Sequence, residues 1–387
     1  MQKRLTLAIA LILPLASLTV NAFSDSAITV WVPADKGYDG IIAMGSRFER
    51  ETGIKVNVRH PDSIEVKFLQ IAATGGGPDI IIFAHDRFGE YAQARLIREI
   101  TVNNDFKAKF ESLTWDALKY KGKYFGYPIA TEALSLIYNK ELISEPMKNW
   151  EDVFAIDETL SAENKKAIMW DLKSPYYTWP LLAANGGYAF KETADGYDTK
   201  DIGVNNKGTR RSMSFVKTLV DRAIISADSD YVNAESAFIH GKVAMTLNGP
   251  WSWANLDKSG VHYELAILPK LNGHPSRPFV GVLSAGINSN SPNAALAVEF
   301  LENYLLTDIG LRLMNAHVPL GAPALKSFLE ELSGDQRVLA TITNARAGEI
   351  MPNIPQMMPF WYGLQSAITN VIQQRQSIED ALSTVEK

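Results

Sequence analysis

The hydrophobic positions of the chain follow two spacings, one typical of buried strands and the other typical of helices. Residues 28–32 form a short apolar strand, and residues 40–51 follow with apolar side chains at helical spacing. A strand at 55–58, a helix through 68–73 and an unbroken apolar run at 79–83 continue the pattern. Such a run is typical of a strand that is buried on both faces of a sheet. Strands that alternate with helices predict an α/β fold.

The ends of several helices are also marked in the sequence. Gly53 stands where a glycine commonly ends a helix. Ser291 followed by Pro292 predicts an N-cap with proline in the first turn, ahead of an apolar face over residues 296–304. Another helix is predicted through 213–223. A chain of 387 residues is too long for one ordinary core, and no long linker divides it, so we expect two domains joined by short crossings.

The first 22 residues have the pattern of a secretory signal peptide. Two basic residues precede an apolar stretch over residues 5–20, and Ala22 ends a cleavage site of small residues. A membrane anchor is the alternative, but the stretch is short for a spanning helix, which needs about 20 apolar residues. We therefore expect export of the chain and a mature start at Phe23.

The composition argues against several classes of protein. The chain has 38 basic and 43 acidic side chains, so it lacks the basic balance that a nucleic-acid partner requires. It has no cysteine, which excludes disulfides, thiolate nucleophiles and the commonest zinc ligands. Its six histidines include no pair at metal-binding spacing. We therefore expect no nucleic-acid partner, no metal and no cofactor, and a fold that its hydrophobic core alone stabilises.

Two polar clusters follow predicted strands. Asp35 and Lys36 come after the first strand, and Asp86 and Arg87 come after the third. In open α/β sheets, ligands bind beyond the carboxyl ends of the strands. Either cluster alone is best explained as a solvated turn that contains an ion pair. Two clusters at equivalent strand ends, each with a carboxylate and a cation, favour a binding site.

Aromatic residues are concentrated in three polar, turn-like stretches. Tyr176, Trp251 and Trp361 lie beside prolines and polar residues, and we predict that they face a cleft. Trp179 and Trp253 each lie two residues from another aromatic, and we predict that they belong to the core. A sugar ring has apolar faces and a belt of hydroxyl groups, which aromatic planes and charged side chains bind respectively. The combination therefore favours a carbohydrate ligand.

Signatures of catalysis are weak. The residues around Ser284 have the wrong spacing for a nucleophile elbow, and the triple glycine at 75–77 lacks the residues that complete a phosphate-binding loop. We interpret His85 as a structural histidine. Glu132, paired with a carboxylate of either polar cluster, leaves a glycoside hydrolase open as the enzyme alternative.

Six segments of the chain resemble the periplasmic maltose/maltodextrin-binding proteins, which are the solute receptors of ATP-binding-cassette importers. The segments are residues 35–38, 84–89, 132–140, 248–251, 280–287 and 349–357. They run in order through almost the whole mature chain. The resemblance implies a two-lobed periplasmic-binding-protein fold whose lobes close on the sugar about a three-segment hinge.

The resemblance also implies how the chain is divided and what it does. It implies a signal peptide (1–22), an N-terminal lobe (23–130 plus 285–330), a C-terminal lobe (135–279 plus 337–387) and hinge crossings near 131–134, 280–284 and 331–336. The protein would be a periplasmic, non-enzymatic monomer that passes maltose or maltodextrin to the membrane subunits of an ABC permease. Signalling of the closed form to a chemoreceptor is compatible with this role. A binding protein for a different oligosaccharide and a glycoside hydrolase are the alternatives.

Carried over residue by residue, the resemblance assigns roles in ligand binding. Hydroxyl groups would be held by Asp35, Lys36, Asp86, Arg87 and Glu132, and sugar rings by Tyr176, Trp251, Trp361 and Tyr362, with Glu65, Phe83 and Met351 as further ligand-binding positions. Four positions depart from the family pattern. They are Phe83 in place of a tryptophan, Ser174 in place of a glutamate, Val66 in place of a second carboxylate and Gln365 in place of an arginine. We expect that maltose still binds and that the preference for longer chains is altered.

Overall fold

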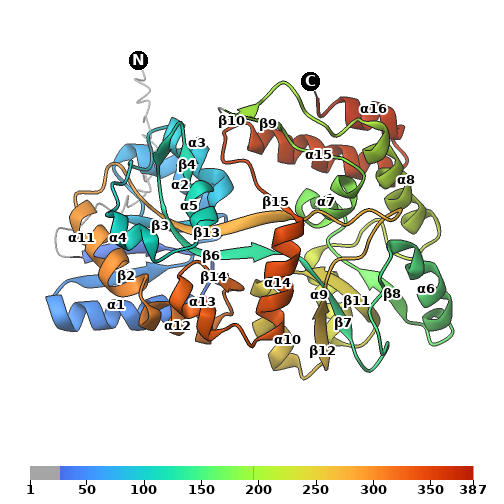
Figure 1. Cartoon of the computed structure of the whole chain (residues 1–387), viewed down its shortest axis with the longest axis horizontal. Coiled ribbons are helices and arrows are strands. Elements are labelled where there is room, and N and C mark those ends of the chain that lie inside the picture. Colours follow the sequence, from blue (N-terminus) through green and yellow to red (C-terminus); the bar gives the residue numbers. More distant parts are fainter. Residues whose placement is uncertain (1–26, 195, 387) are drawn as a thin grey trace, which may run out of the picture.

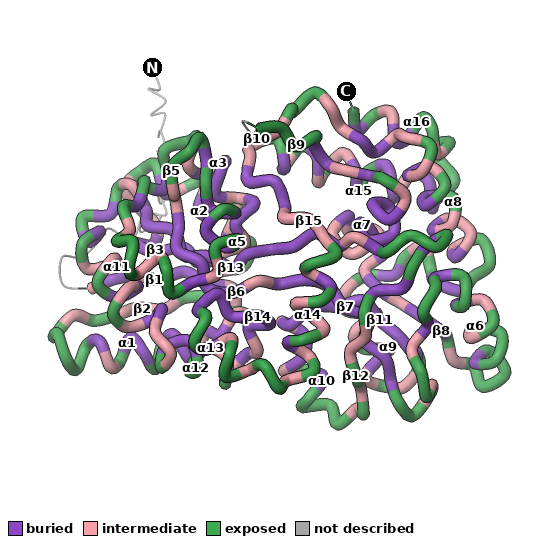
Figure 2. The backbone as a smooth tube through the Cα atoms, in the orientation of Figure 1, coloured by how far each residue is buried: buried purple, intermediate pink, exposed green. Residues whose placement is uncertain are grey.

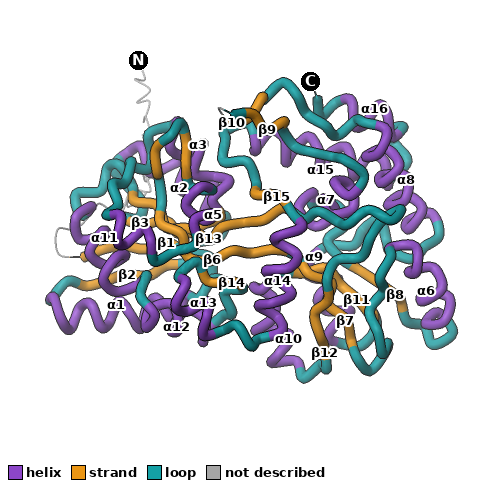
Figure 3. The backbone as a smooth tube through the Cα atoms, in the orientation of Figure 1, coloured by secondary structure: helices purple, strands orange, loops and turns teal. Residues whose placement is uncertain are grey.

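The computed structural model describes residues 27–194 and 196–386. The predicted signal peptide (1–22) and the expected mature start at Phe23 lie outside the described residues. Figure 1 shows two lobes, and Figure 3 shows that each contains strands flanked by helices. Each lobe has its own sheet, which confirms the predicted two-lobed α/β fold. Within the described ranges, no helix is both long enough and apolar enough to cross a membrane.

The N-terminal lobe is built on a seven-stranded sheet with the order β14-β6-β13-β3-β1-β2, in which β15 also pairs with β13. The strands are β1 (Ala27–Trp31), β2 (Lys55–Arg59), β3 (Ile80–Ala84), β6 (Tyr127–Ala133), β13 (Phe279–Ile287), β14 (Ala322–Pro323) and β15 (Glu349–Ile350). Helices of this lobe are α1 (Tyr38–Thr52), α2 (Ile64–Ile71), α3 (Phe88–Gln93), α4 (Asn104–Ala108), α5 (Ser112–Asp116), α11 (Ala294–Phe300), α12 (Asp308–His317) and α13 (Lys326–Glu331). A small hairpin joins β4 (Lys119–Tyr120) to β5 (Lys123–Tyr124).

The C-terminal lobe is built on a four-stranded sheet with the order β12-β7-β11-β8. Its strands are β7 (Ser135–Asn139), β8 (Lys166–Met169), β11 (Val243–Asn248) and β12 (Tyr263–Ala266), and β9 (Lys191–Thr193) and β10 (Gly196–Asp198) form a separate hairpin. The helices are α6 (Val153–Ser161), α7 (Pro175–Ala184), α8 (Lys207–Asp221), α9 (Tyr231–Ile239), α10 (Trp253–Ser259), α14 (Gln336–Ala347), α15 (Met357–Ile372) and α16 (Ile378–Ser383).

The central strands of both sheets are buried on their two faces, as Figure 2 shows. Side chains on a strand alternate between the faces. In β3, Ile80 and Ile82 therefore pack into one hydrophobic cluster and Ile81 into another. In β7, Leu136 and Ile137 are divided between two clusters in the same way. The prediction that residues 79–83 form a strand buried on both faces is confirmed.

The predicted helix ends are confirmed in one case and wrong in the other. Gly53 ends α1 with a left-handed φ of 77°, a conformation that glycine adopts without steric cost. Ser291 does not cap α11, because Asn293 is the residue at that N-cap. The Ser291 hydroxyl instead donates a hydrogen bond of 2.5 Å to Asp79 Oδ1, just before β3. The same hydroxyl oxygen also accepts a hydrogen bond of 3.0 Å from the backbone N–H of Asn293, so Ser291 stabilises the turn before α11 and ties it to a distant segment without being the N-cap residue.

The chain passes between the two sheets through short segments. Strand β6 ends at Ala133 in the first sheet, and β7 begins at Ser135 in the second, so Leu134 alone separates them. Strand β13 then returns to the first sheet and pairs antiparallel with β6, and Figure 1 shows these two strands side by side between the lobes. Helix α14 contacts β6 and β14 on one side and β7 and β12 on the other.

Candidate functional site

A cavity of about 730 Å³, here called the cleft cavity, is lined by residues from both lobes. It brings together most of the residues that the sequence singled out: Asp35, Lys36, Phe83, Asp86, Arg87, Glu132, Tyr176, Trp251, Met351 and Trp361. These residues are spread over more than 300 positions of the chain, and the fold gathers them around one space.

The charged residues of the cleft cavity lie at the carboxyl edge of the first sheet. Strands β1 and β3 are parallel neighbours, so the clusters that follow them meet at the same edge. Lys36 Nζ lies 2.5 Å from Glu132 Oε1 and forms an ion pair with it. Glu132 is 6% exposed, and this burial raises the pKa of its carboxyl group, although Lys36 opposes the shift. Lys36 therefore holds a buried carboxylate in place at the edge of the cavity.

Asp86 is the second buried carboxylate of the cavity. It is 7% exposed, and burial raises the pKa of its carboxyl group against the opposing charge of Arg87. The indole Nε1–H of Trp361, on α15 of the C-terminal lobe, donates a hydrogen bond of 3.1 Å to Asp86 Oδ2. Arg87 lies 3.6 Å from Glu90 on α3. The Asp86–Trp361 bond joins the two lobes across the cavity.

Aromatic side chains of the C-terminal lobe form the facing wall. Tyr176 stands in the first turn of α7, after Pro175 at the helix start, and its ring centroid lies 6.0 Å from that of Trp251. Trp251 belongs to the 3₁₀ turn Pro250–Ser252, which follows β11. Its ring folds back over Gly249, where a Cβ atom would lie 2.2 Å from the indole, so a side chain at that position would clash with it.

A contact between the walls joins charge to aromatic surface. Lys36 Nζ lies 4.4 Å from the ring centroid of Trp251, within the range of a cation–π interaction. The cation that holds Glu132 in the N-terminal lobe therefore also contacts the aromatic wall of the other lobe. Together the walls offer ring faces and carboxylate oxygens, which suit a neutral ligand with apolar faces and hydroxyl groups.

The two tryptophans predicted to be core residues are buried. Trp179 has no exposed surface and stacks on Phe279 with a centroid distance of 4.4 Å and an interplanar angle of 7°. Trp253 is 1% exposed and packs beneath the second sheet. The prediction that these two tryptophans belong to the core is therefore confirmed, whereas Trp251 is partly exposed.

Two of the predicted ligand-binding residues do not line the cleft cavity. Glu65 lies on α2, partly buried, and Tyr362 follows Trp361 with 61% of its surface exposed. Of the four departures from the family pattern, Phe83 and Ser174 line the cavity, and Val66 and Gln365 are exposed elsewhere.

Sequence reasoning missed other residues of the wall. Tyr177, Tyr231 and Asn255 all line the cavity. Tyr177 is adjacent to a residue that was predicted, and Tyr231 directly follows Asp230, the N-cap of α9. An aromatic residue in the first turn of a helix, as in Tyr176, was the available sign for Tyr231.

The described part of the chain offers no evident place for a metal ion. Within it, no three His, Asp or Glu side chains gather in a suitable arrangement. His85 has no exposed surface and both of its ring nitrogens are engaged by backbone groups, so its structural interpretation agrees with its surroundings.

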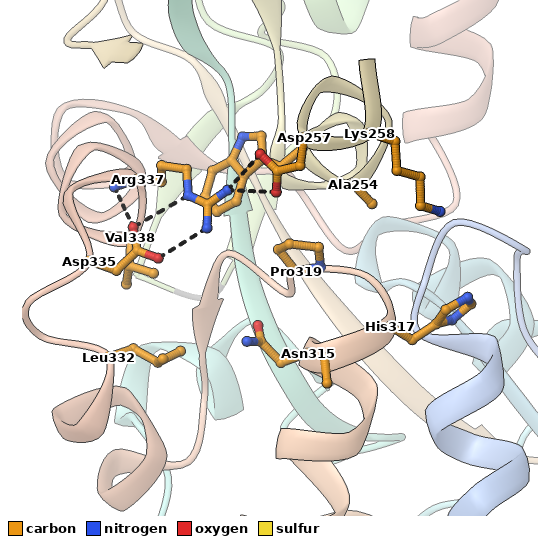
Figure 4. A pocket seen from close by; sticks show the side chains of 12 residues that line it. Ala254, Asp257, Lys258, Asn315, His317, Pro319, Leu332, Asp335, Arg337 and Val338 are labelled. Atoms are coloured by element: carbon orange, nitrogen blue, oxygen red, sulfur yellow. Dashed lines mark hydrogen bonds and ion pairs between the residues drawn. The ribbon is translucent and has the colours of Figure 1, made fainter. Parts of the chain in front are cut away.

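A second cavity has a volume of about 430 Å³ and is here called the Arg337 cavity. Its lining comes from α10, from the last turn of α12 and Pro319 after it, and from residues between 332 and 338. Figure 4 shows Arg337 between Asp257 and Asp335. Its guanidinium donates hydrogen bonds to both carboxylates and lies 5.1 Å from the ring centroid of Trp253. Arg337 is therefore paired with both carboxylates that line this cavity.

Comparisons with known proteins identify relatives along most of the chain. The galactooligosaccharide-binding protein of Bacillus subtilis is 28% identical over 375 residues, covering 93% of this chain and 88% of the relative. The maltotriose-binding protein of Pyrococcus abyssi is 27% identical and covers 79% and 68%. The maltodextrin-binding protein of B. subtilis is 27% identical and covers 95% and 91%.

A sequence profile of one family covers most of the two lobes. The profile describes the bacterial extracellular solute-binding proteins and matches residues 34–309, a stretch that includes both polar clusters, Glu132, the aromatic residues of α7 and Trp251. This chain belongs to the family of bacterial extracellular solute-binding proteins.

Proposed function

We propose that this protein is a periplasmic, non-enzymatic receptor that captures maltose and maltodextrins between its lobes and delivers them to an ABC permease. The observation that carries the proposal is the cleft cavity itself, in which carboxylates of one lobe face aromatic rings of the other. Two relatives with maltotriose or maltodextrin in their names support the choice of sugar. A galactooligosaccharide-binding relative of similar identity makes galactooligosaccharides the second candidate.

The charges of the cavity favour a neutral ligand. Lys36 is already paired with Glu132, and Arg87 lies near Glu90. Asp86 and Glu132 can accept hydrogen bonds from hydroxyl groups but would repel an anion. Neutral sugars should therefore bind in preference to uronates or phosphorylated sugars of the same size.

The lobes would close on the sugar about a hinge near 131–134, 280–284 and 331–336, between an N-terminal lobe (23–130 plus 285–330) and a C-terminal lobe (135–279 plus 337–387). The short passage from β6 to β7, the return of β13 and the approach to α14 support this placement. A ligand that contacts both lobes binds the closed state more tightly and so shifts the population towards it. The closed monomer would then dock on the permease, and a chemoreceptor is a further candidate partner.

Calorimetric titration of the mature chain, starting at Phe23, tests the ligand. The panel contains maltose, maltotriose, maltotetraose, a galactooligosaccharide and glucuronic acid. We expect dissociation constants in the micromolar range for the maltodextrins, about 8 kcal/mol of binding free energy. Phe83 and Ser174 depart from the family pattern and line the cavity, so we expect an altered preference for longer chains. Tighter binding of the galactooligosaccharide would replace maltodextrin by the second candidate, and no binding of any sugar would refute the proposal.

Prolonged incubation with maltotetraose tests the enzyme alternative. Glu132 and Asp86 are each held by a partner, Lys36 and Trp361 respectively, and we expect no release of shorter sugars. Steady, protein-dependent release, measured by chromatography, would instead favour a glycoside hydrolase.

Spin labels can test the hinge, because the chain has no cysteine of its own. Val66 and Val232 are exposed positions on α2 and α9, one in each proposed lobe. The distance between labels at Val66→Cys and Val232→Cys should change when sugar is added. A pair within one lobe, Val66→Cys with Ile42→Cys, should keep its distance, and equal behaviour of the two pairs would contradict the proposed hinge.

A further inference from the structure

His85 lies behind the wall of the cleft cavity with no exposed surface. Its Nδ1 accepts a hydrogen bond of 2.9 Å from the backbone N–H of Val282, and its Nε2 lies 2.8 Å from the carbonyl oxygen of Met351. A backbone N–H can only donate and a carbonyl can only accept, so the proton must be on Nε2. Burial lowers the pKa of His85 to about 4, which keeps this neutral form at neutral pH.

The three segments that this ring joins all contribute to the cleft cavity. Asp86 and Arg87 follow His85 directly and line the cavity. Val282 lies in β13 between Gly281 and Leu283, which line it as well, and Met351 is itself a lining residue. The bonded positions are 197 and 266 residues from His85 in the sequence. A single side chain thus connects three lining segments that are distant along the chain.

Asn353 strengthens the same junction. Its Oδ1 accepts a hydrogen bond of 2.5 Å from the backbone N–H of Gly89, and its Nδ2 donates to the carbonyl oxygen of Lys119. A Cβ atom at Gly89 would lie 2.4 Å from the carbonyl oxygen of Asn353, so the two backbones are in close contact. Residues 351–353 are therefore held against residues 85–89, which comprise the 3₁₀ turn that carries Asp86 and Arg87 and the start of α3.

This junction leads directly into the helix that supplies an aromatic residue of the cavity. Residues 351–353 precede α15, and α15 carries Trp361, whose indole donates to Asp86. The position of Asp86 relative to Trp361 thus depends on the contact between residues 85–89 and the segment at 351–353. His85 supplies one of the directional bonds that fix this contact, the bond to Met351, and its other bond ties His85 to Val282 in β13.

We propose that His85 is a positioning residue of the binding site: through Val282 and Met351 it sets the placement of Asp86 relative to Trp361. The inference rests on the proposed function, since it assumes that the cleft cavity is where the sugar binds. It goes further in assigning a role to a residue that cannot itself touch the ligand.

Three substitutions separate the two bonds. His85→Asn keeps an acceptor near the position of Nδ1 but is too short to reach Met351. His85→Gln can donate to Met351 but leaves the N–H of Val282 without its acceptor. His85→Ala loses both bonds. Should the alanine variant fail to fold, the asparagine and glutamine variants still test the proposal.

Asn288→Ala is the matched control. Asn288 has no exposed surface and stands at the opposite end of β13, where its side chain donates to the carbonyl of Pro78 and accepts from the N–H of Asn290. It therefore resembles His85 in burial and in its bonds to backbone groups, but it does not line or support the cleft cavity.

Sugar affinity, urea unfolding and the indole ¹⁵N–H resonance of Trp361 are measured for each variant. We expect His85→Ala to weaken binding of the sugar that wild type binds best by roughly 30-fold. The asparagine and glutamine variants should be intermediate, and Asn288→Ala should stay within about threefold of wild type even if it unfolds as readily. The Trp361 resonance, assigned with Trp361→Phe, should shift in all His85 variants without sugar and should not shift in Asn288→Ala.

Two results together would overturn the proposal. The first is a loss of affinity that follows the loss of stability in the His85 variants and in Asn288→Ala alike, and the second is a Trp361 resonance that does not shift. Failure of wild type to bind any sugar would refute the proposed function instead. In that case the resonance still decides whether His85 positions Asp86 and Trp361, because it is recorded on the sugar-free protein.

Discussion

The cleft cavity and the Arg337 cavity contain similar side chains in opposite arrangements. Each combines tryptophan with carboxylates and cations, and Trp251 of the cleft cavity is only two positions from Trp253 of the Arg337 cavity. Trp251 is partly exposed and takes part in a wall of aromatic rings. Trp253 is 1% exposed, and the guanidinium of Arg337 lies beside it.

The difference lies in what remains available to a ligand. In the Arg337 cavity, Asp257 and Asp335 both accept hydrogen bonds from Arg337, and the cation is used within the protein. In the cleft cavity, Asp86 and Glu132 each have one close partner and are held at a surface that several rings share. A carboxylate oxygen accepts more than one hydrogen bond, so these two groups keep capacity for hydroxyl groups. Residue types alone therefore do not define a binding site.

The largest effects should come from the two tryptophans. Trp253→Ala should lower the free energy of unfolding by about 3–5 kcal/mol, because it leaves a void in a fully buried cluster. Trp251→Ala should cost much less stability and should weaken sugar binding roughly 100-fold, because it removes a ring of the cavity wall. Urea unfolding and calorimetric titration measure both. The comparison fails if the two variants lose stability equally and Trp251→Ala keeps full affinity.

The next largest difference should be the effect on sugar affinity of replacing a carboxylate in each cavity. Glu132→Gln should weaken sugar binding roughly 30-fold, because it removes a charged acceptor and leaves Lys36 without its partner. Asp257→Asn, in the Arg337 cavity, should change the dissociation constant by less than about twofold, since distant sites act independently. The same titrations measure both variants. An equal loss of affinity in the two would mean that the cavities are coupled.

Sugar affinity should depend on pH through the two buried carboxylates of the cleft cavity. Burial raises the pKa of both Glu132 and Asp86, so each binds its proton more tightly in the folded chain. Their contribution to folding is therefore present at low pH and is lost as the pH rises through the raised values. Sugar affinity should change in the opposite direction: if the ionised forms bind hydroxyl groups, protonation of each carboxylate should lower the affinity about tenfold for each pH unit below the raised pKa of that group.

Titration of the variants provides the control for this pH dependence. Glu132→Gln and Asp86→Asn should each flatten the fall in affinity below the raised pKa values, although both bind more weakly at pH 7. If wild type and variants show the same pH dependence, other groups cause it.

The smallest effect is expected at Arg337. Arg337→Met should lower the free energy of unfolding by about 1 kcal/mol, since its ion pairs with Asp257 and Asp335 are partly exposed to solvent. Sugar affinity should stay within about twofold of wild type. A larger loss of affinity would show that the Arg337 cavity takes part in binding or closure.

The sequence predicts those parts of the site that depend on strand order. Asp35 with Lys36 and Asp86 with Arg87 follow parallel neighbouring strands, so their proximity follows from the α/β pattern. Glu132 and Met351 could be placed only through the resemblance to a known family, because their partners are far away in sequence. Lys36 is 96 residues from Glu132, and no local pattern records that contact.

The errors have a similar physical origin. Ser291 was predicted to be the N-cap of a helix, but it lies in the turn before α11, and its hydroxyl also donates a hydrogen bond to Asp79, which is 212 residues away. Tyr231 was missed because its neighbours in sequence look like an ordinary helix start, and only the fold turns its ring into the cavity wall. Local patterns thus predict the elements well, and long-range pairing decides which side chains meet.

The position of β13 in the first sheet has a consequence for how the chain folds. This strand lies between β3 and β6, so Leu283 pairs with Ala84 and Ala130, and almost 150 residues of the second lobe are synthesised in between. Until β13 is available, β3 and β6 have no central neighbour and expose unpaired backbone edges. Contacts between such distant residues slow folding. The first lobe to be synthesised is therefore the lobe that must wait for the second, because its central strand is absent until nearly three quarters of the chain has been made.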